Sequence, residues 1–197
     1  MLIILSLKCK IRIRYISFQF CFVVGPFQRG INAVLLEKDD LTAGTTWHSA
    51  GLHWRLRPND TDIRLLDRTR ELAKTDGILH KLTGMDVWTP NGGLFCANNG
   101  PRLDEYRRLQ TIGKCFDIES HILKPSEVTD VYPLINTDDL VGCLYSPGDG
   151  LIDPSGITQA FASAAKKLGG KVFTKTEVTG IDVVDKKVQG VQTPPPI

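Results

Sequence analysis

The sequence lacks several patterns by which whole classes of protein are recognised. Its five cysteines, an odd number, form no C-x-x-C pair, so we interpret them as reduced thiols or buried small side chains. No basic cluster with interleaved aromatic residues occurs, which leaves a nucleic-acid-binding function with little support. His53, His80 and His121 have no metal-ligand spacing and are interpreted as ordinary surface or loop residues. No metal site is therefore expected.

The first 30 residues lack acidic side chains altogether, although they contain five basic ones. The apolar stretch 15–24 is too short to span a bilayer as a helix. Alternation over Lys10–Arg14 predicts a strand rather than the amphipathic helix of a mitochondrial presequence. Two interpretations of residues 1–30 stay open: a targeting segment, or an unrelated leader or artefact joined to the rest of the sequence, as at an altered exon boundary.

The chain also lacks the glycine-rich phosphate loop G-x-G-x-x-G. Such a loop is expected because the apolar run Ala33–Leu36 ends in Glu37, which is typical of the second strand of a dinucleotide-binding unit with its ribose-binding acid. Residues 20–25 could imitate a first strand and turn. Only Gly25–Asn32 then separates them from Ala33, which is too short for the crossover between parallel strands. Backbone N–H groups to hold a pyrophosphate are thus not expected here.

What the chain does contain, after Glu37, is a turn of small residues from Leu41 to Leu52. It holds Gly44, Thr45 and Thr46, followed by Trp47 and His48. A histidine flanked by small residues in such a turn can approach a flat cofactor ring closely.

The rest of the chain, 197 residues with 42% hydrophobic and 23% charged residues, is an α+β succession. Asn59 or Asp60 caps a helix that ends at Gly84, with a break near 75–77 and a buried face marked by Leu65, Leu72 and Leu79. Further helices are predicted over 102–116, from Ser126 to about Tyr132, and from Pro154 to about Leu168, the last capped by Asp153. Strands are predicted over 87–89 and 93–97, as a hairpin, and over 141–145, 150–152, 171–174, 177–183 and 187–192.

Several motifs together resemble the FAD-dependent amine oxidoreductases that include sarcosine dehydrogenase and dimethylglycine dehydrogenase. The resemblance runs from about Gly30 to about Thr193, and the segments Trp54–Pro58 and Asn91–Phe95 favour the sarcosine dehydrogenase branch. The motifs are Val34–Lys38, Gly44–Leu52, Trp54–Pro58, Asn91–Phe95, Arg102–Tyr106 and Gly148–Pro154.

The resemblance implies an α/β (α+β) fragment of the D-amino-acid-oxidase type. Residues 31–60 and 150–193 would form part of a Rossmann-like FAD-binding domain, and residues 61–149 part of an inserted mixed-sheet substrate domain. Residues 1–30 would be the atypical leader.

The same resemblance implies the roles of individual residues. His48 would carry the flavin covalently and Glu37 would bind the adenosine ribose, with the turn lining pyrophosphate and flavin. Arg55 and Arg57 could steer a substrate carboxylate or be solvated, and both interpretations stay open. Asp149 and Asp153 suit a turn and a helix cap. No catalytic residue is assigned. The residues expected to bind the cofactor are His48, Glu37, Lys38, Gly44, Thr45, Thr46, Trp47, Ser49, Ala50, Gly51, Leu52 and Val178.

The activity implied by the resemblance is oxidation of sarcosine to glycine, with hydride transfer from the N-methyl group to FAD. Electron-transfer flavoprotein would be the acceptor, tetrahydrofolate would bind in a C-terminal portion that this sequence does not contain, and the location would be the mitochondrial matrix. Because the phosphate loop is absent, this chain alone is expected to be inactive. A dimethylglycine dehydrogenase, or a non-catalytic relative such as the pyruvate dehydrogenase phosphatase regulatory subunit, is the alternative.

Overall fold

The computed structural model describes residues 2–6, 12–13 and 33–194, which form two compact units. Unit 1 consists of Met1–Ala50, Ala73–Val87 and Asp153–Ile197, and unit 2 consists of Gly51–Leu72 and Trp88–Ile152. The assignment of one region to the cofactor and another to the substrate stays a prediction. Within the described ranges, no helix is both long and apolar enough to cross a membrane.

The sheet of unit 1 has the strand order β10-β3-β1-β2. β3 (Ala33–Glu37) runs parallel to β10 (Lys171–Phe173) and antiparallel to β1 (Leu2–Ser6), which in turn pairs with β2 (Arg12–Ile13). The strand predicted over Lys10–Arg14 is confirmed for β2, and its other residues lie outside the described part of the chain. On one side, therefore, the acid-bearing strand has a parallel neighbour, as a dinucleotide-binding unit requires.

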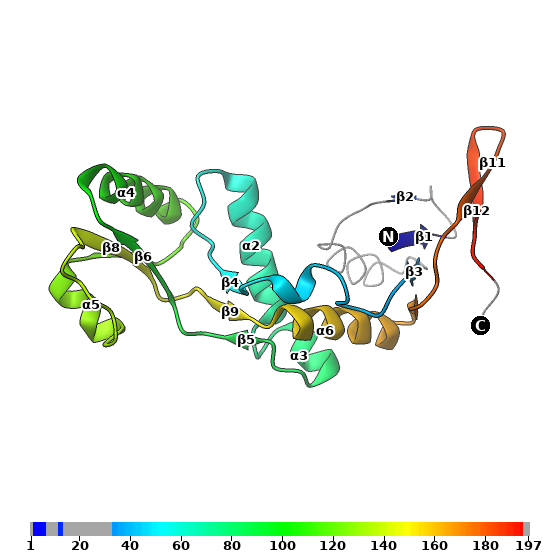
Figure 1. Ribbon diagram of the computed structural model, residues 1–197, viewed down its shortest axis with the longest axis horizontal. Coiled ribbons are helices and arrows are strands. Elements are labelled where there is room, and N and C mark those ends of the chain that lie inside the picture. Colours follow the sequence, from blue (N-terminus) through cyan, green and yellow to red (C-terminus); the bar gives the residue numbers. More distant parts are fainter. Residues whose placement is uncertain (1, 7–11, 14–32, 195–197) are drawn as a thin grey trace. The chain divides into compact units, whose positions relative to one another are not determined.

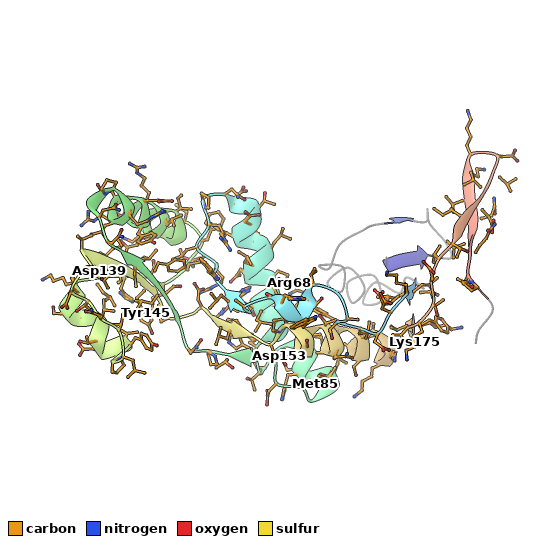
Figure 2. The ribbon with its side chains drawn as sticks, viewed as in Figure 1. Arg68, Met85, Asp139, Tyr145, Asp153 and Lys175 are labelled. Carbon is orange, nitrogen blue, oxygen red and sulfur yellow. The ribbon has the colours of Figure 1, made fainter. Side chains whose placement is uncertain are left out.

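Two helices of unit 1, α3 (Ile78–Thr83) and α6 (Pro154–Lys167), pack against each other (Figure 1). Asp153, labelled in Figure 2, is the N-cap of α6, as predicted. Its Oδ1 accepts a hydrogen bond of 3.0 Å from the backbone N–H of Ser155. Gly169 then ends the helical segment with a φ of +89°.

The C-terminal part of unit 1 is a hairpin of β11 (Gly180–Val184) and β12 (Lys187–Gln192). Asp185 and Lys186 form its turn with positive φ values of 49° and 59°, at the position that the sequence predicts. Val178, just before the hairpin, packs with Leu36 of β3 in a small hydrophobic cluster.

Unit 2 is built on an antiparallel sheet of β6 (Gly93–Ala97), β8 (Gly142–Ser146) and β7 (His121–Leu123). Figure 1 shows α4 (Gly100–Lys114) and α5 (Pro125–Val131) on opposite sides of this sheet. Side chains of α4 pack against Phe95 and the fully buried Leu144 to form the core.

The hairpin predicted from residues 87–89 and 93–97 is wrong. Both strands exist, but β5 (Trp88–Thr89) pairs with β9 (Gly150–Ile152) in a second small sheet with β4 (Leu52–His53), whereas β6 pairs with β8. The turn residues between β5 and β6 form a hydrogen bond to a distant segment instead, since Gly92 N–H donates to the carbonyl of Asp149 at 3.0 Å. Long-range pairing has overridden a local turn signal.

The long helix predicted up to Gly84 is interrupted as expected, between α2 (Asp60–Ala73) and α3. Its predicted buried face is wrong at Leu65, which is 63% exposed, whereas Ile63 is buried in the core with Leu56 and Leu144. The register differs because the inward face of α2 also carries the partly buried Asp67, which pairs with a buried arginine.

Candidate functional site

The last residue of β3, Glu37, lies where the sheet of unit 1 is tied to the segment after β10. Its carbonyl accepts a hydrogen bond of 2.8 Å from Thr176 N–H, and the carbonyl of Asp39 accepts one of 3.2 Å from Lys175 N–H. Its carboxylate Oε1 accepts from the backbone N–H of Asp39 at 3.1 Å. The carboxylate is thereby held at the carboxyl end of a parallel strand, which is where open α/β sheets bind their ligands.

The turn that follows is compact but open to solvent. Ala43 N–H donates to the carbonyl of Asp40 at 3.2 Å, and Thr46–His48 form the single 3-10 turn η1, which contacts α6. A side chain added at Gly44 would meet no atom within 4 Å. The open space over this glycine is compatible with a ligand that approaches the backbone.

His48 and Trp47 present their rings together on this turn. Both residues are exposed, Trp47 by 61%, and their ring centroids lie 3.7 Å apart at an angle of 33°. No hydrogen-bond partner for the imidazole is present among the described residues. Both ring nitrogens are therefore accessible to a ligand that lies against the turn.

The predicted cofactor residues do not all fall in one unit. Glu37, Lys38, the turn residues Gly44–Ala50 and Val178 belong to unit 1, whereas Gly51 and Leu52 belong to unit 2. Lys38 is half-exposed and forms an ion pair of 3.5 Å with Asp39. The side chain of Val178 is buried, so it can offer a ligand chiefly its backbone.

These residues fit part of an FAD molecule. An acid at the strand end suits a ribose, and an accessible imidazole on an open turn suits the flavin ring. Nothing in the described part of unit 1 provides the glycine-rich turn before a helix that binds the pyrophosphate. On the side of β3 away from β10, its neighbour is the antiparallel β1.

Unit 2 contains a buried ionic cluster centred on Arg55. Its Nε donates to Asp149 Oδ1 at 3.0 Å, and its Nη1 donates to Asp67 Oδ1 at 3.1 Å. Arg55 is only 6% exposed and Asp149 is fully buried. The solvated interpretation of Arg55 is thus wrong, whereas its carboxylate-steering role stays a prediction, disfavoured because two carboxylates already bind its Nε and Nη1. The simple turn role expected for Asp149 is likewise incomplete.

Only a glycine is accommodated beside this cluster at position 148. A Cβ there would collide with Nη2 of Arg55, which lies across the backbone of the turn between β8 and β9. The turn predicted at Gly148 therefore also lies directly against the guanidinium of Arg55.

His53 was expected to lie on the surface, and this expectation is wrong. The residue is 6% exposed, and its Nε2 lies 3.0 Å from the carbonyl oxygen of Leu66. Because a carbonyl only accepts, Nε2 carries the proton and donates. Desolvation by burial lowers the pKa of His53 below 6.5, although the nearby Asp149 opposes this effect. A signal was present in the sequence, since His53 and Arg55 are two residues apart and so share one face of an extended segment.

A shallow pocket in unit 2 opens beside His53. It has about 360 Å³ of space including its open mouth, and its lining includes Trp54, Leu94, Phe95 and Gly150. Trp54 and Phe95 meet edge to face, with centroids 5.1 Å apart, and the guanidinium of Arg57 lies 5.0 Å from the Trp54 ring. The described residues contain no group of three or more side chains that could hold a metal ion.

The buried imidazole makes the stability of unit 2 depend on pH. The pKa of His53 in the folded protein is lowered from 6.5, so its neutral form stabilises the fold above pH 6.5. This stability is lost in the window in which the pH falls from 6.5 through the folded pKa. We expect wild type to lose up to about 1.4 kcal/mol per pH unit in that window relative to His53→Gln, which keeps a donor but does not titrate. Urea unfolding at pH 7.5 and 5.0 measures this. An equal loss in both proteins would contradict the prediction.

Comparison with known proteins places the chain in a family. The family model described as FAD dependent oxidoreductase (DAO) matches residues 27–195, and the chain belongs to this family. The mitochondrial sarcosine dehydrogenase of Homo sapiens is 48% identical over 167 residues, which cover 82% of this chain and 18% of that protein. The mitochondrial dimethylglycine dehydrogenase of Rattus norvegicus is 34% identical over 164 residues, 83% of this chain and 19% of that protein.

The fold agrees with this assignment. The crystal structure of L-proline dehydrogenase from P. horikoshii superposes with a TM-score of 0.81 at 24% identity, over 90% of this chain and 46% of that one. The predicted D-amino-acid-oxidase type of fold is confirmed, as is the resemblance to sarcosine dehydrogenases. The chain spans only 18% of the length of the human relative that it matches.

Proposed function

We propose that this chain is the part of a sarcosine dehydrogenase-type enzyme that binds the adenosine ribose and carries the flavin of FAD. The observation that carries the proposal is the exposed imidazole of His48, tilted against the ring of Trp47 in an open turn after the acid-terminated strand β3. Family membership and 48% identity to a sarcosine dehydrogenase support the choice of reaction. The reaction is oxidative demethylation of sarcosine to glycine.

Each residue of the turn has a separate role in this proposal. Glu37 accepts hydrogen bonds from ribose hydroxyls, and a nitrogen of the neutral His48 ring forms the covalent bond to the flavin. The small residues Gly44, Ser49 and Ala50 let the ligand lie close to the backbone. Lys38 and Val178 are secondary contacts, the latter near the adenine. Thr45 and Thr46 complete the lining in unit 1, and the proposed roles of Gly51 and Leu52, which belong to unit 2, rest on the resemblance alone.

When bound, FAD supplies the acceptor for the hydride that leaves the N-methyl carbon of the substrate. The chain's own residues would then orient the amino acid. Arg57 is the better candidate for its carboxylate, because its guanidinium is partly exposed and lies against the face of Trp54, with no carboxylate partner among the described residues. Arg55 is a poorer candidate because it is buried and its Nε and Nη1 already bind Asp149 and Asp67.

The wider setting is part of the same proposal, and the mitochondrial names of the relatives support its location. Electrons would pass to an electron-transfer flavoprotein, and the location would be the mitochondrial matrix. Tetrahydrofolate would bind to a part of the enzyme outside this chain. Dimethylglycine oxidation is the second candidate substrate reaction, and a regulatory protein without activity is the candidate from another class, as for the pyruvate dehydrogenase phosphatase regulatory subunit.

The test is a chimera, because the chain spans a small part of its relatives. Residues 34–193 replace the matching segment of the human relative, and the purified protein is assayed for dye reduction with sarcosine or dimethylglycine. We expect sarcosine-dependent turnover and flavin that stays with the protein after acid precipitation.

Each other outcome has a defined meaning. A soluble chimera that binds flavin but is faster with dimethylglycine would favour the second substrate. A folded chimera without turnover on either amine, and without acid-stable flavin, would contradict the proposal and favour the regulatory class. The unmodified human enzyme is the control.

A further inference from the structure

Two cysteines that are 47 positions apart in the sequence lie opposite each other on adjacent strands of unit 2. Cys96 on β6 and Cys143 on β8 are direct partners in the antiparallel register. Directly opposite residues in such a pair have Cα atoms about 4.5–5.5 Å apart. A disulfide requires a Cα separation of about 4.4–6.8 Å, so this position satisfies the backbone condition without any rearrangement of the strands.

The side chains also lie on one face of the sheet. Phe95 and Leu144, the neighbouring pair, point into the core beneath α4. Alternation along a strand therefore directs Cys96 and Cys143 to the opposite face, on which Tyr145 also lies (Figure 2). The two thiols are close enough to hydrogen-bond to each other.

The two thiols differ in access to solvent. Cys96 is exposed, whereas Cys143 is fully buried, and both are reduced in this structure. Burial raises the pKa of the Cys143 thiol to about 12, and the hydrogen bond with Cys96 acts in the same direction. A reagent in solution therefore meets Cys96 first, and Cys143 is the nearest thiol that can react next.

We infer that Cys96 and Cys143 form a peroxide-sensitive dithiol site, in which oxidation joins β6 to β8 by a disulfide. In the first step, the Cys96 sulfur attacks one oxygen of hydrogen peroxide, the O–O bond breaks, and the other oxygen leaves as water with the Cys96 thiol proton, which gives a sulfenic acid at Cys96. In the second, the Cys143 sulfur attacks that sulfenic sulfur, the S–O bond breaks, and a second water leaves with the Cys143 proton. One peroxide is reduced and two thiols are oxidised.

The experiment treats the full 197-residue chain with hydrogen peroxide at neutral pH and maps its peptides by mass spectrometry. We expect loss of two hydrogens and a linked peptide pair that contains Cys96 and Cys143. The loss should disappear in Cys96→Ser. In Cys143→Ala, the sulfenic acid should persist at Cys96 and be trapped as a dimedone adduct.

Cys115→Ser is the matched control, because Cys115 is also exposed but lies at the end of α4 without a facing thiol among the described residues. It should oxidise at the Cys96–Cys143 pair as wild type does. The inference is overturned if Cys96 is oxidised without joining Cys143, or if it links to another cysteine. Retained circular dichroism in each variant shows that the result does not come from unfolding.

Discussion

His48→Asn in the chimera is expected to release all flavin on acid precipitation, whereas the parent chimera retains it. The reason is chemical, since a covalent bond to the flavin needs a nucleophilic ring nitrogen, and asparagine offers only an amide of similar size and polarity. The turn should survive the change, because η1 is held by backbone bonds and no side chain of η1 is buried. Fluorescence of the washed, acid-precipitated protein measures the retained flavin.

His121→Asn is the control for this experiment. His121 is exposed like His48, but it lies on β7 and contacts Glu119 and Tyr145. It should keep the acid-stable flavin of the parent chimera. Acid-stable flavin in His48→Asn would show that another residue is the attachment point, and the proposed role of the turn would have to be abandoned.

The second large effect is expected at the buried ionic cluster. Asp149→Ala should destabilise unit 2 by about 3–5 kcal/mol, because it leaves the Arg55 guanidinium buried without its fully buried partner. The change also removes an acceptor for the backbone N–H of Arg55, at 3.4 Å. Arg55 would keep only Asp67, whose side chain is 47% exposed.

Asp67→Ala is the matched variant, since it removes the other carboxylate of the same arginine. It should cost about 1 kcal/mol or less, because solvent screens an exposed pair. Asp149→Ala and Asp67→Ala are compared in a Trp47→Phe background. In this background, the fluorescence of Trp54 and Trp88 follows the unfolding of unit 2 in urea. Equal losses of unfolding free energy in the two variants would contradict the burial argument.

The elements that were predicted correctly are those fixed by local chemistry. Asp153 caps α6, Gly169 ends its helical segment, and the positive φ values of Asp185 and Lys186 close the last hairpin. The break before α3 follows from the same kind of signal at Gly77. Such features depend on residues a few positions apart, so the sequence contains all the information that they need.

The wrong predictions concern residues whose burial or pairing is determined by contacts with distant segments of the chain. Leu65 fits a helical face as well as Ile63 does, and the distant contacts of Ile63 with Leu56 and Leu144, together with the pairing of Asp67, decide between them. Arg55 and Asp149 are separated by 94 positions, so their pairing has no local signature. The two-residue spacing of His53 and Arg55 indicates that they share a face, but the bond of His53 to Leu66, 13 positions away on α2, has no local signature. The ribose-binding role of Glu37 was predicted from the strand pattern, whereas the flavin-carrying role of His48 came from the resemblance, and both stay predictions.

The division of the chain into units also has a consequence for its biosynthesis. Unit 1 is assembled from three separate stretches, and the last begins only at Asp153. β3 emerges from the ribosome early, but its parallel partner β10 follows more than 130 residues later. Such pairing at long sequence separation folds slowly and leaves strand edges exposed. The acid-bearing strand therefore stays unpaired on that side until β10 has been synthesised, and a chaperone that shields it should raise the yield of folded protein.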